Sequence, residues 1–469
     1  MQLSADNKRT SFWSLLAQAV RGDVKDFTTG SIDRAIFLLA VPMVLEMVLE
    51  SFFALVDIFF VNKVSPAAAA VVGLTESSLT ILYSVAWGLA MGATALIARR
   101  AGEKNFGAAS AIAGQCIGIA AVLSVLISIG GILFPKEILL FMGADAGVAA
   151  ENYHFTQLML GSNLVIMLLF VNNGIFRGSG DASLAMRSLI IANIINIVLD
   201  PLLIMGYGPF PKMGLMGAAV STTIGRGVGV LYQLYHLFAG RDLVKIRLDK
   251  LKPSLELIRR IFVTSSGGMI QFLIGSCSWI FLARIIARSG VESTSGYFTA
   301  IRICIFTLLP AWGIANAAAT LTGQNLGAKQ PERAEKSVWR SAFLALCFFA
   351  VVGLVFFFFG EQLMKAFTSN PVAIAEGTSC LHILSLGYLF FAYGMVLTQA
   401  FNGAGDTRTP TYLNLVVFWG IQIPMAYYIA VELGWGTKGV YWAIAVCESL
   451  LATISIFLFK KGKWKLVQV

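Results

Sequence analysis

The sequence predicts an all-α integral membrane protein with twelve transmembrane helices in two six-helix bundles, related by a pseudo-two-fold axis along the membrane normal. Three observations support this prediction. Charged residues make up 13% of the chain, against about 25% in soluble domains, and the mean hydropathy is +0.77. Apolar runs of at least about 20 residues, enough to cross a bilayer, recur along the chain. Finally, the second half repeats motifs of the first.

The apolar runs follow one another with short polar connections. In the first half the expected spans are 35–61, 67–98, 108–134, 154–176, 185–206 and 214–239. In the second half they are 258–287, 295–322, 337–360, 380–402, 410–432 and 438–459.

The spans divide the chain into five parts. We expect an N-terminal segment, a first bundle, a linker, a second bundle and a basic tail, at 1–33, 34–240, 241–257, 258–460 and 461–469. The N-terminal segment contains a short amphipathic stretch around Phe12 and Trp13 that could lie on the membrane surface.

Basic residues gather in the termini and in alternate loops, as at Arg99 and Arg100, in the linker, and at the C-terminal lysines. This asymmetry is the positive-inside pattern and places both termini in the cytoplasm. The sequence pI near 9.3 therefore reflects membrane topology. Because no basic face is interleaved with aromatic residues, we expect no nucleic-acid partner.

Two motifs recur at one spacing. Phe176-Arg-Gly-Ser-Gly-Asp181 returns as Phe401-Asn-Gly-Ala-Gly-Asp406, an offset of 225 residues (401 − 176). Thr94-Ala-Leu-Ile-Ala-Arg-Arg-Ala-Gly102 returns more loosely as Ala319-Thr-Leu-Thr-Gly-Gln-Asn-Leu-Gly327 at the same offset (327 − 102). Because six spans per half is an even number, both halves enter the membrane in the same direction. The relating axis then runs along the membrane normal, with a cavity between the halves.

The first span carries three acids, Glu46, Glu50 and Asp57, together with Pro42. A carboxylate at mid-membrane depth costs at least about 2.5–3.5 kcal/mol and usually marks a functional cavity. The spacing of the three acids places them near one helix face. Pro42 removes a backbone hydrogen bond and can kink the helix. The alternative is that some of these acids lie near the span ends or form salt bridges.

The repeat allows a comparison within the sequence. The fifth span adds Asn196 and Asp200, four residues apart on one face. At the repeat offset, the five polar positions of the first half are mostly apolar in the second: Gln271, Gly275, Leu282, Ile421 and Met425. The sequence therefore predicts one ion site, located inside the N-terminal half.

The chemistry of this predicted site suits Na⁺ or H⁺. A hard cation prefers oxygen ligands, and Asp57, Asn196, Asp200, the Thr222 hydroxyl and the Ala218 carbonyl could supply them. Two carboxyl groups in a low-dielectric site can also share a proton. Alternatively, Asn196 forms a helix–helix hydrogen bond, and Ala218 and Thr222 are small packing residues.

Further polar and aromatic residues lie at membrane depth. Four charged residues could either pair across helices or line the central cavity: Glu76, Arg226, Arg302 and Glu448. A possible substrate cavity comprises Gln271, Trp279, Arg302, Tyr388 and Tyr393, although aromatic residues in a span more often pack or lie at the interface. We find no motif for phosphate binding, nucleophilic hydrolysis or zinc, and therefore expect no enzyme activity and no cofactor.

At these residues the chain resembles the MATE (multidrug and toxic compound extrusion) transporters. The resemblance rests on five stretches: Thr28-Thr-Gly-Ser-Ile-Asp-Arg leading into Leu39-Ala-Val-Pro42, Leu55-Val-Asp57, Phe176-Arg-Gly-Ser-Gly-Asp181, Asn196-Ile-Val-Leu-Asp200-Pro and Gly217-Ala-Ala-Val-Ser-Thr222. It implies a bacterial-type inner-membrane antiporter that exports amphipathic, often cationic drugs and dyes against a Na⁺ or H⁺ gradient. It also implies that the coupling cation binds at Asp57, Asn196, Asp200, Ala218 and Thr222, with Pro42 as the kink.

The chain departs from the NorM-like branch of the family, which carries acids on the seventh and tenth helices. The corresponding residues here are Gln271 and Ala392, so the resemblance implies a DinF-like mechanism in the N-terminal bundle. Glu46 and Glu50 would add negative charge near that site. We expect a monomer whose other partner is membrane lipid. The alternatives are a lipid-linked precursor flippase of the same wider superfamily and a membrane-embedded lipid-modifying enzyme.

Overall fold

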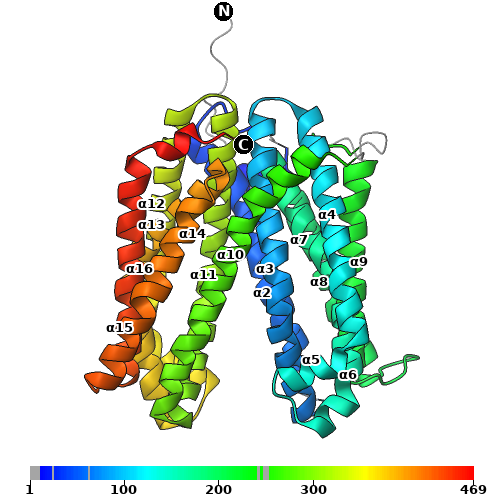
Figure 1. The fold of residues 1–469 in the computed structure, drawn as a ribbon, viewed down its shortest axis with the longest axis vertical. Helices are drawn as coiled ribbons and strands as arrows, with labels where there is room; N and C mark the ends of the chain where they lie inside the picture. The colour runs from blue at the N-terminus through cyan, green and yellow to red at the C-terminus, as the bar shows by residue number, and fades with distance from the viewer. Residues whose placement is uncertain (1–10, 24–25, 62–63, 240–242, 247–252, 469) are drawn as a thin grey trace, which may run out of the picture.

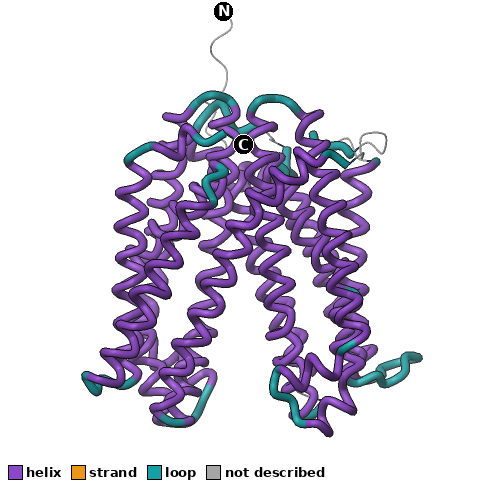
Figure 2. Tube along the Cα trace, viewed as in Figure 1, coloured by secondary structure: helices purple, strands orange, loops and turns teal. Residues whose placement is uncertain are grey.

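Helices make up both halves of the protein. The computed structural model describes residues 11–23, 26–61, 64–239, 243–246 and 253–468, and within these ranges it contains no strand. The linker residues Arg247, Lys250 and Lys252, assigned above to the cytoplasmic side, lie outside the described residues. Figures 1 and 2 show two helical bundles that meet at one end and diverge at the other.

The first bundle follows the expected order of spans. Its helices are α2 (Ile32–Val61), α3 (Pro66–Gly102), α4 (Phe106–Leu133), α6 (Ala146–Gly161) with α7 (Asn163–Ser179), α8 (Ala182–Met205) and α9 (Leu215–Phe238). The fourth predicted span is therefore two consecutive helices. Two short helices, α1 (Phe12–Arg21) and α5 (Pro135–Phe141), flank the bundle.

The second bundle has longer helices than the apolar runs suggest. They are α10 (Leu255–Ile286), α11 (Val291–Gly327), α12 (Pro331–Phe367), α13 (Pro371–Ala404), the composite helix from α14 (Arg408–Asn414) through η3 (Leu415–Gln422), α15 (Ile423–Tyr427) and η4 (Tyr428–Glu432), and α16 (Thr437–Lys460). The segments η3 and η4 are π-helical. The short 3₁₀ segments are η2 (Ala287–Ser289) and η5 (Lys463–Leu466).

Eleven helical spans in the described part of the chain are long and apolar enough to cross a membrane. The remaining predicted span coincides with α9, which is 24 residues long but falls below the hydropathy of the other eleven spans. Its Thr222, Arg226 and Gln233 are all buried inside the protein, so α9 can occupy a bundle without exposing these groups to lipid. The predicted all-α, two-bundle membrane fold is confirmed.

The repeated Gly-Asp motif is a helix C-terminus used twice. Gly180 and Gly405 end α7 and α13 in the left-handed conformation, with φ of 89° and 90°. The amide of the following aspartate then donates to the carbonyl five residues back, Asp181 to Phe176 at 2.8 Å and Asp406 to Phe401 at 3.0 Å. A residue with a Cβ is disfavoured at such positive φ, which accounts for glycine at the same place in both halves.

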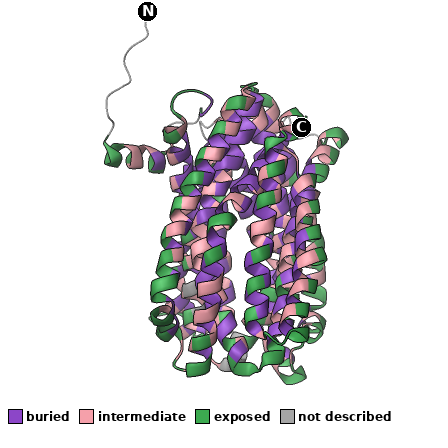
Figure 3. Ribbon diagram, turned by 90° about the vertical axis from the view of Figure 1, so that its left-hand side faces the viewer, coloured by how far each residue is buried: buried purple, intermediate pink, exposed green. Residues whose placement is uncertain are grey.

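The two bundles meet through α2, α3, α10 and α11 at the end of the molecule that carries η5 (Figure 1). Glycines permit the close approach. Gly102 of α3 packs on the backbone of Gln324 in α11, and Gly327 of α11 packs on that of Arg99 in α3. At the opposite end the bundles separate. Figure 3, which looks onto the C-terminal bundle, shows exposed and half-buried residues along the outward-facing sides of its helices.

Candidate functional site

A cavity of about 390 Å³ lies in the N-terminal bundle. Side chains from α2, α3 and α9 line it, and α11 of the other bundle closes one side. Five of the lining residues are charged: Glu50, Asp57, Glu76, Arg226 and Arg302. The cavity therefore contains the acids Glu50 and Asp57 of α2. It also contains Glu76, Arg226 and Arg302, for which the sequence left helix pairing and cavity lining as alternatives.

The two aspartates of the predicted cation site meet the same turn of α9. The Thr222 hydroxyl donates to the Asp57 carboxylate, with both oxygens at 3.4 Å. The neighbouring Ser221 hydroxyl donates to Oδ1 of Asp200 in a short hydrogen bond and also contacts the Ala218 carbonyl oxygen at 3.0 Å. Adjacent α9 residues thus hold Asp57 of α2 and Asp200 of α8.

Two acceptor atoms at this point have no partner. Asn196 Nδ2 donates to Asp200 Oδ1 at 3.2 Å, yet Asn196 Oδ1 and Asp200 Oδ2 are buried without a hydrogen bond among the described residues. Leaving a buried acceptor unsatisfied is costly. A neutral amide oxygen and a carboxylate oxygen without partners suit a proton or a hard cation such as Na⁺.

Arg226 neutralises the charge of one acid in the cavity lining. Arg226 donates to Glu50 Oε1 at 3.0 Å, and its guanidinium lies 4.6 Å from the centre of the Phe53 ring. Arg226 therefore both pairs across helices and lines the cavity. Glu76 accepts from the Tyr83 hydroxyl at 3.5 Å.

Glu46 lies in a separate buried network. Its side chain is 1% exposed and does not belong to the cavity lining. Asn173 Nδ2 donates to Glu46 Oε1 at 2.9 Å, and Arg177 Nη1 lies 3.5 Å from the same oxygen. Gln233 Nε2 then donates to Asn173 Oδ1 at 2.6 Å and to Ser188 at 2.8 Å. This network ties α2, α7, α8 and α9 together.

Pro42 lies inside α2, which remains helical from Ile32 to Val61. Two residues further on, the Val44 backbone packs against Gly313 of α11. The proline is thus next to a contact between the two bundles.

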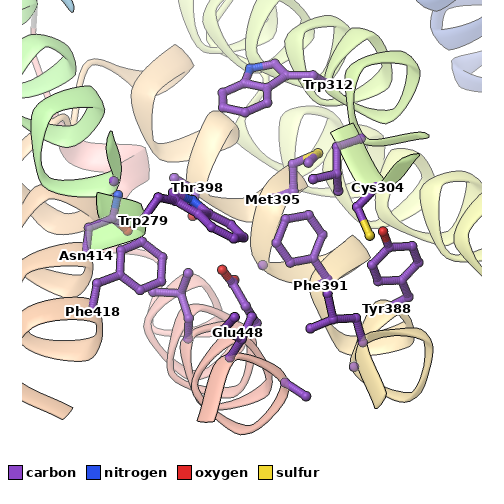
Figure 4. A pocket seen from close by; sticks show the side chains of 18 of the residues that line it. Trp279, Cys304, Trp312, Tyr388, Phe391, Met395, Thr398, Asn414, Phe418 and Glu448 are labelled. Atoms are coloured by element: carbon purple, nitrogen blue, oxygen red, sulfur yellow. The ribbon is translucent and has the colours of Figure 1, made fainter. Parts of the chain in front are cut away.

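The predicted substrate residues do not form one cavity. Gln271, Trp279 and Tyr388 line a second cavity of about 340 Å³ in the C-terminal bundle, together with Glu448 (Figure 4). Arg302 lines the N-terminal cavity. Tyr393 packs on Trp339, with ring centres 6.2 Å apart, and belongs to neither lining.

Sequence reasoning missed Ser221 as a partner of Asp200. It stands beside Thr222 within the α9 motif, so the same motif contained the signal. No sequence pattern indicated Asn173 and Arg177 as partners of Glu46, because these contacts join residues 127 and 131 positions apart in the sequence.

Comparison with known proteins agrees with these observations. The MatE family description matches residues 42–202 and 269–428. The probable multidrug resistance protein NorM of Thermotoga maritima is 26% identical over 434 residues, which cover 92% of this chain and 93% of that protein.

Solved structures have the same fold. MATE in complex with MaL6 has a TM-score of 0.87 and 26% identity, and the likeness covers 96% of this chain and 98% of that one. An outward-facing multidrug resistance MATE family transporter of the MOP superfamily has a TM-score of 0.86 and 25% identity, covering 98% and 99%. The predicted resemblance is confirmed: the chain belongs to the MatE family, whose members are membrane transporters and not enzymes.

Proposed function

We propose that this protein is a cation-coupled multidrug efflux antiporter, driven by Na⁺ or H⁺, that exports amphipathic, often cationic organic compounds by alternating access. The observation that carries the proposal is that Asp57 of α2 and Asp200 of α8 accept hydrogen bonds from adjacent residues of α9, with Asn196 Oδ1 and Asp200 Oδ2 buried and without partners. The names of relatives support the substrate class, since NorM of Thermotoga maritima is a probable multidrug resistance protein.

In this proposal the coupling cation binds at Asp57, Asn196, Asp200, Thr222 and the Ala218 carbonyl. All of these residues belong to the N-terminal bundle, in keeping with a DinF-like rather than a NorM-like arrangement. Glu50 tunes the local charge through Arg226. Glu46 acts from further away through its buried network.

Binding of one monovalent cation lowers the net negative charge of the two carboxylates from −2 to −1, and this change favours a bend of α2 at Pro42. Because Val44 packs on Gly313, a bend there shifts α2 relative to α11 and changes the N-terminal cavity. The cation drives this change only through a difference in its affinity for the two conformations.

The positive-inside pattern assigns the converging end of the bundles to the cytoplasm and the diverging end to the exterior. On this assignment both termini are cytoplasmic, the membrane is a bacterial-type inner membrane, and the conformation described above is open to the exterior. The protein acts as a monomer surrounded by lipid. The five-part division of the chain at 33, 240, 257 and 460 belongs to the same proposal.

The test is dye efflux from proteoliposomes with an imposed Na⁺ gradient or an imposed pH gradient, applied separately. Efflux driven by one gradient and not by the other supports the proposal and names the ion. Lipid scrambling without dye movement would instead support a flippase, and no movement under either gradient would contradict the proposal.

A further inference from the structure

The C-terminal cavity has its own chemistry. Residues from α10, α11, α13, η3 and α16 surround it, and most of them are aliphatic or aromatic. A volume of about 340 Å³ falls in the range typical of small-molecule sites. Figure 4 shows aromatic rings on opposite sides, with Trp279 and Phe418 facing Phe391 and Tyr388.

Among the described residues that line this cavity, Glu448 alone is charged. It is the twelfth of the 24 residues of α16, so it lies near mid-membrane depth. It makes no hydrogen bond or ion pair with any described residue. Its carboxyl group points into the space between Trp279 and Phe391 (Figure 4). A carboxylate held at this depth without a partner indicates a ligand that supplies the opposite charge.

The wall of the cavity also has unused hydrogen-bonding atoms. Trp312 Nε1 and Thr398 Oγ1 are buried and have no partner among the described residues. Both residues line the same cavity. Native proteins satisfy the great majority of buried polar atoms, so two orphans in one cavity point to an occupant that bonds to them.

The C-terminal cavity differs from the N-terminal cavity at positions that the internal repeat makes equivalent. At the repeat offset of 225, Glu50 of the N-terminal cavity corresponds to Gly275, and Thr223 corresponds to Glu448 (448 − 225). Gly275 lines the C-terminal cavity, and a Cβ added there would meet nothing within 4 Å. The C-terminal cavity thus has open space where the N-terminal cavity has an arginine-paired acid. The acid in its own lining, Glu448, lies on a different helix, α16.

We propose that the C-terminal cavity is a binding site for a lipophilic organic monocation, with Glu448 as its counter-ion. The aromatic faces of Trp279, Phe391 and Phe418 contact the apolar body of the ligand and attract its delocalised charge. This inference rests on the proposed export of organic cations and adds to it the place where the cation is held. The inorganic cation and the organic cation then occupy different bundles.

The test is equilibrium binding of labelled tetraphenylphosphonium to the purified full-length protein in lipid nanodiscs, without any ion gradient. Glu448→Gln removes the charge at nearly constant shape and should weaken binding about tenfold or more. Gly275→Leu fills the open space without changing charge and should weaken binding to a similar extent. Glu448→Asp keeps the charge and should retain most of the affinity.

Glu361→Gln is the matched control, because Glu361 lies on the exposed end of α12 in an ion pair with Lys365. Binding by this variant should equal that of the wild type. Thermal unfolding of every variant separates loss of the site from loss of the fold.

Wild-type affinity in both Glu448→Gln and Gly275→Leu would overturn the inference. So would normal tetraphenylphosphonium binding by Glu448→Gln with loss of gradient-driven efflux, since Glu448 would then serve the coupling ion. Because the binding assay needs no gradient, these outcomes differ from failure of the proposed antiport, in which the wild type itself moves no dye under either gradient.

Discussion

The two bundles share a helix order and a glycine-ended motif, yet their cavities differ in charge. The N-terminal cavity is lined by three carboxylates and two guanidinium groups, and the C-terminal cavity by one carboxylate among aromatic rings. The backbone features that the halves share, such as Gly180 and Gly405, serve the fold. In the proposed function, the residues in which the halves differ at mid-membrane depth determine what each cavity binds.

The largest effect should come from removing the two carboxylates that contact α9, those of Asp57 in α2 and Asp200 in α8. We expect Asp57→Asn and Asp200→Asn each to reduce drug resistance of expressing cells to the level of cells without the protein. Each change removes a negative charge needed to hold the cation while leaving an oxygen acceptor in place. Resistance assays, together with quantification of protein in the membrane, check this.

Glu151→Gln is the control for these two variants, because Glu151 is an exposed acid of the same bundle. It should keep wild-type resistance. Wild-type resistance in either aspartate variant would contradict the assignment of the cation site to the N-terminal bundle.

A large effect on stability should follow from Glu46→Ala. This change leaves Arg177 buried without its acid, and breaking a buried ion pair costs about 3 kcal/mol. The midpoint of thermal unfolding in detergent should fall accordingly. Wild-type stability combined with lost transport would instead assign Glu46 to the transport cycle directly.

A smaller effect should come from Gly313→Ala, where the bundles touch. An added Cβ would lie 2.6 Å from the Val44 amide nitrogen, so α2 and α11 must separate slightly. Overpacking of this kind costs about 1–3 kcal/mol. Spin labels on the two helices should report a longer distance, and an unchanged distance would show that the contact does not limit how closely the bundles approach.

The smallest effect should come from Arg340→Ala. Arg340 pairs with Asp33 at 2.6 Å, but the two side chains are 47% and 61% exposed. Ion pairs in such surroundings contribute little. Unfolding temperature and dye efflux should both match the wild type, and a clear loss of either would reveal a role for this inter-bundle pair.

The fold was largely predictable from the sequence, because a bilayer imposes helix length and apolarity. The least apolar span, α9, shows why hydropathy alone is incomplete. Its polar residues include Thr222, which meets Asp57, and Arg226, which meets Glu50. The break between α6 and α7 at Ser162 also escaped prediction, since the apolar run continues through it.

The candidate sites were predictable only in part. Spacing along one helix relates Asn196 to Asp200, and the repeat drew attention to the acids of the first half. No local pattern relates Glu46 to Asn173, or divides Gln271 and Arg302 between two cavities. Those relations depend on how helices pack across more than a hundred residues of sequence.

The central claim is that Asp57 and Asp200 share one small cation whose release is coupled to drug binding. Drug-induced infrared difference spectroscopy tests it directly, because carboxyl bands respond both to protonation and to Na⁺ coordination. The account predicts a carboxyl difference band in the wild type that disappears in Asp57→Asn and in Asp200→Asn alike. A band that persists unchanged in both variants would contradict it.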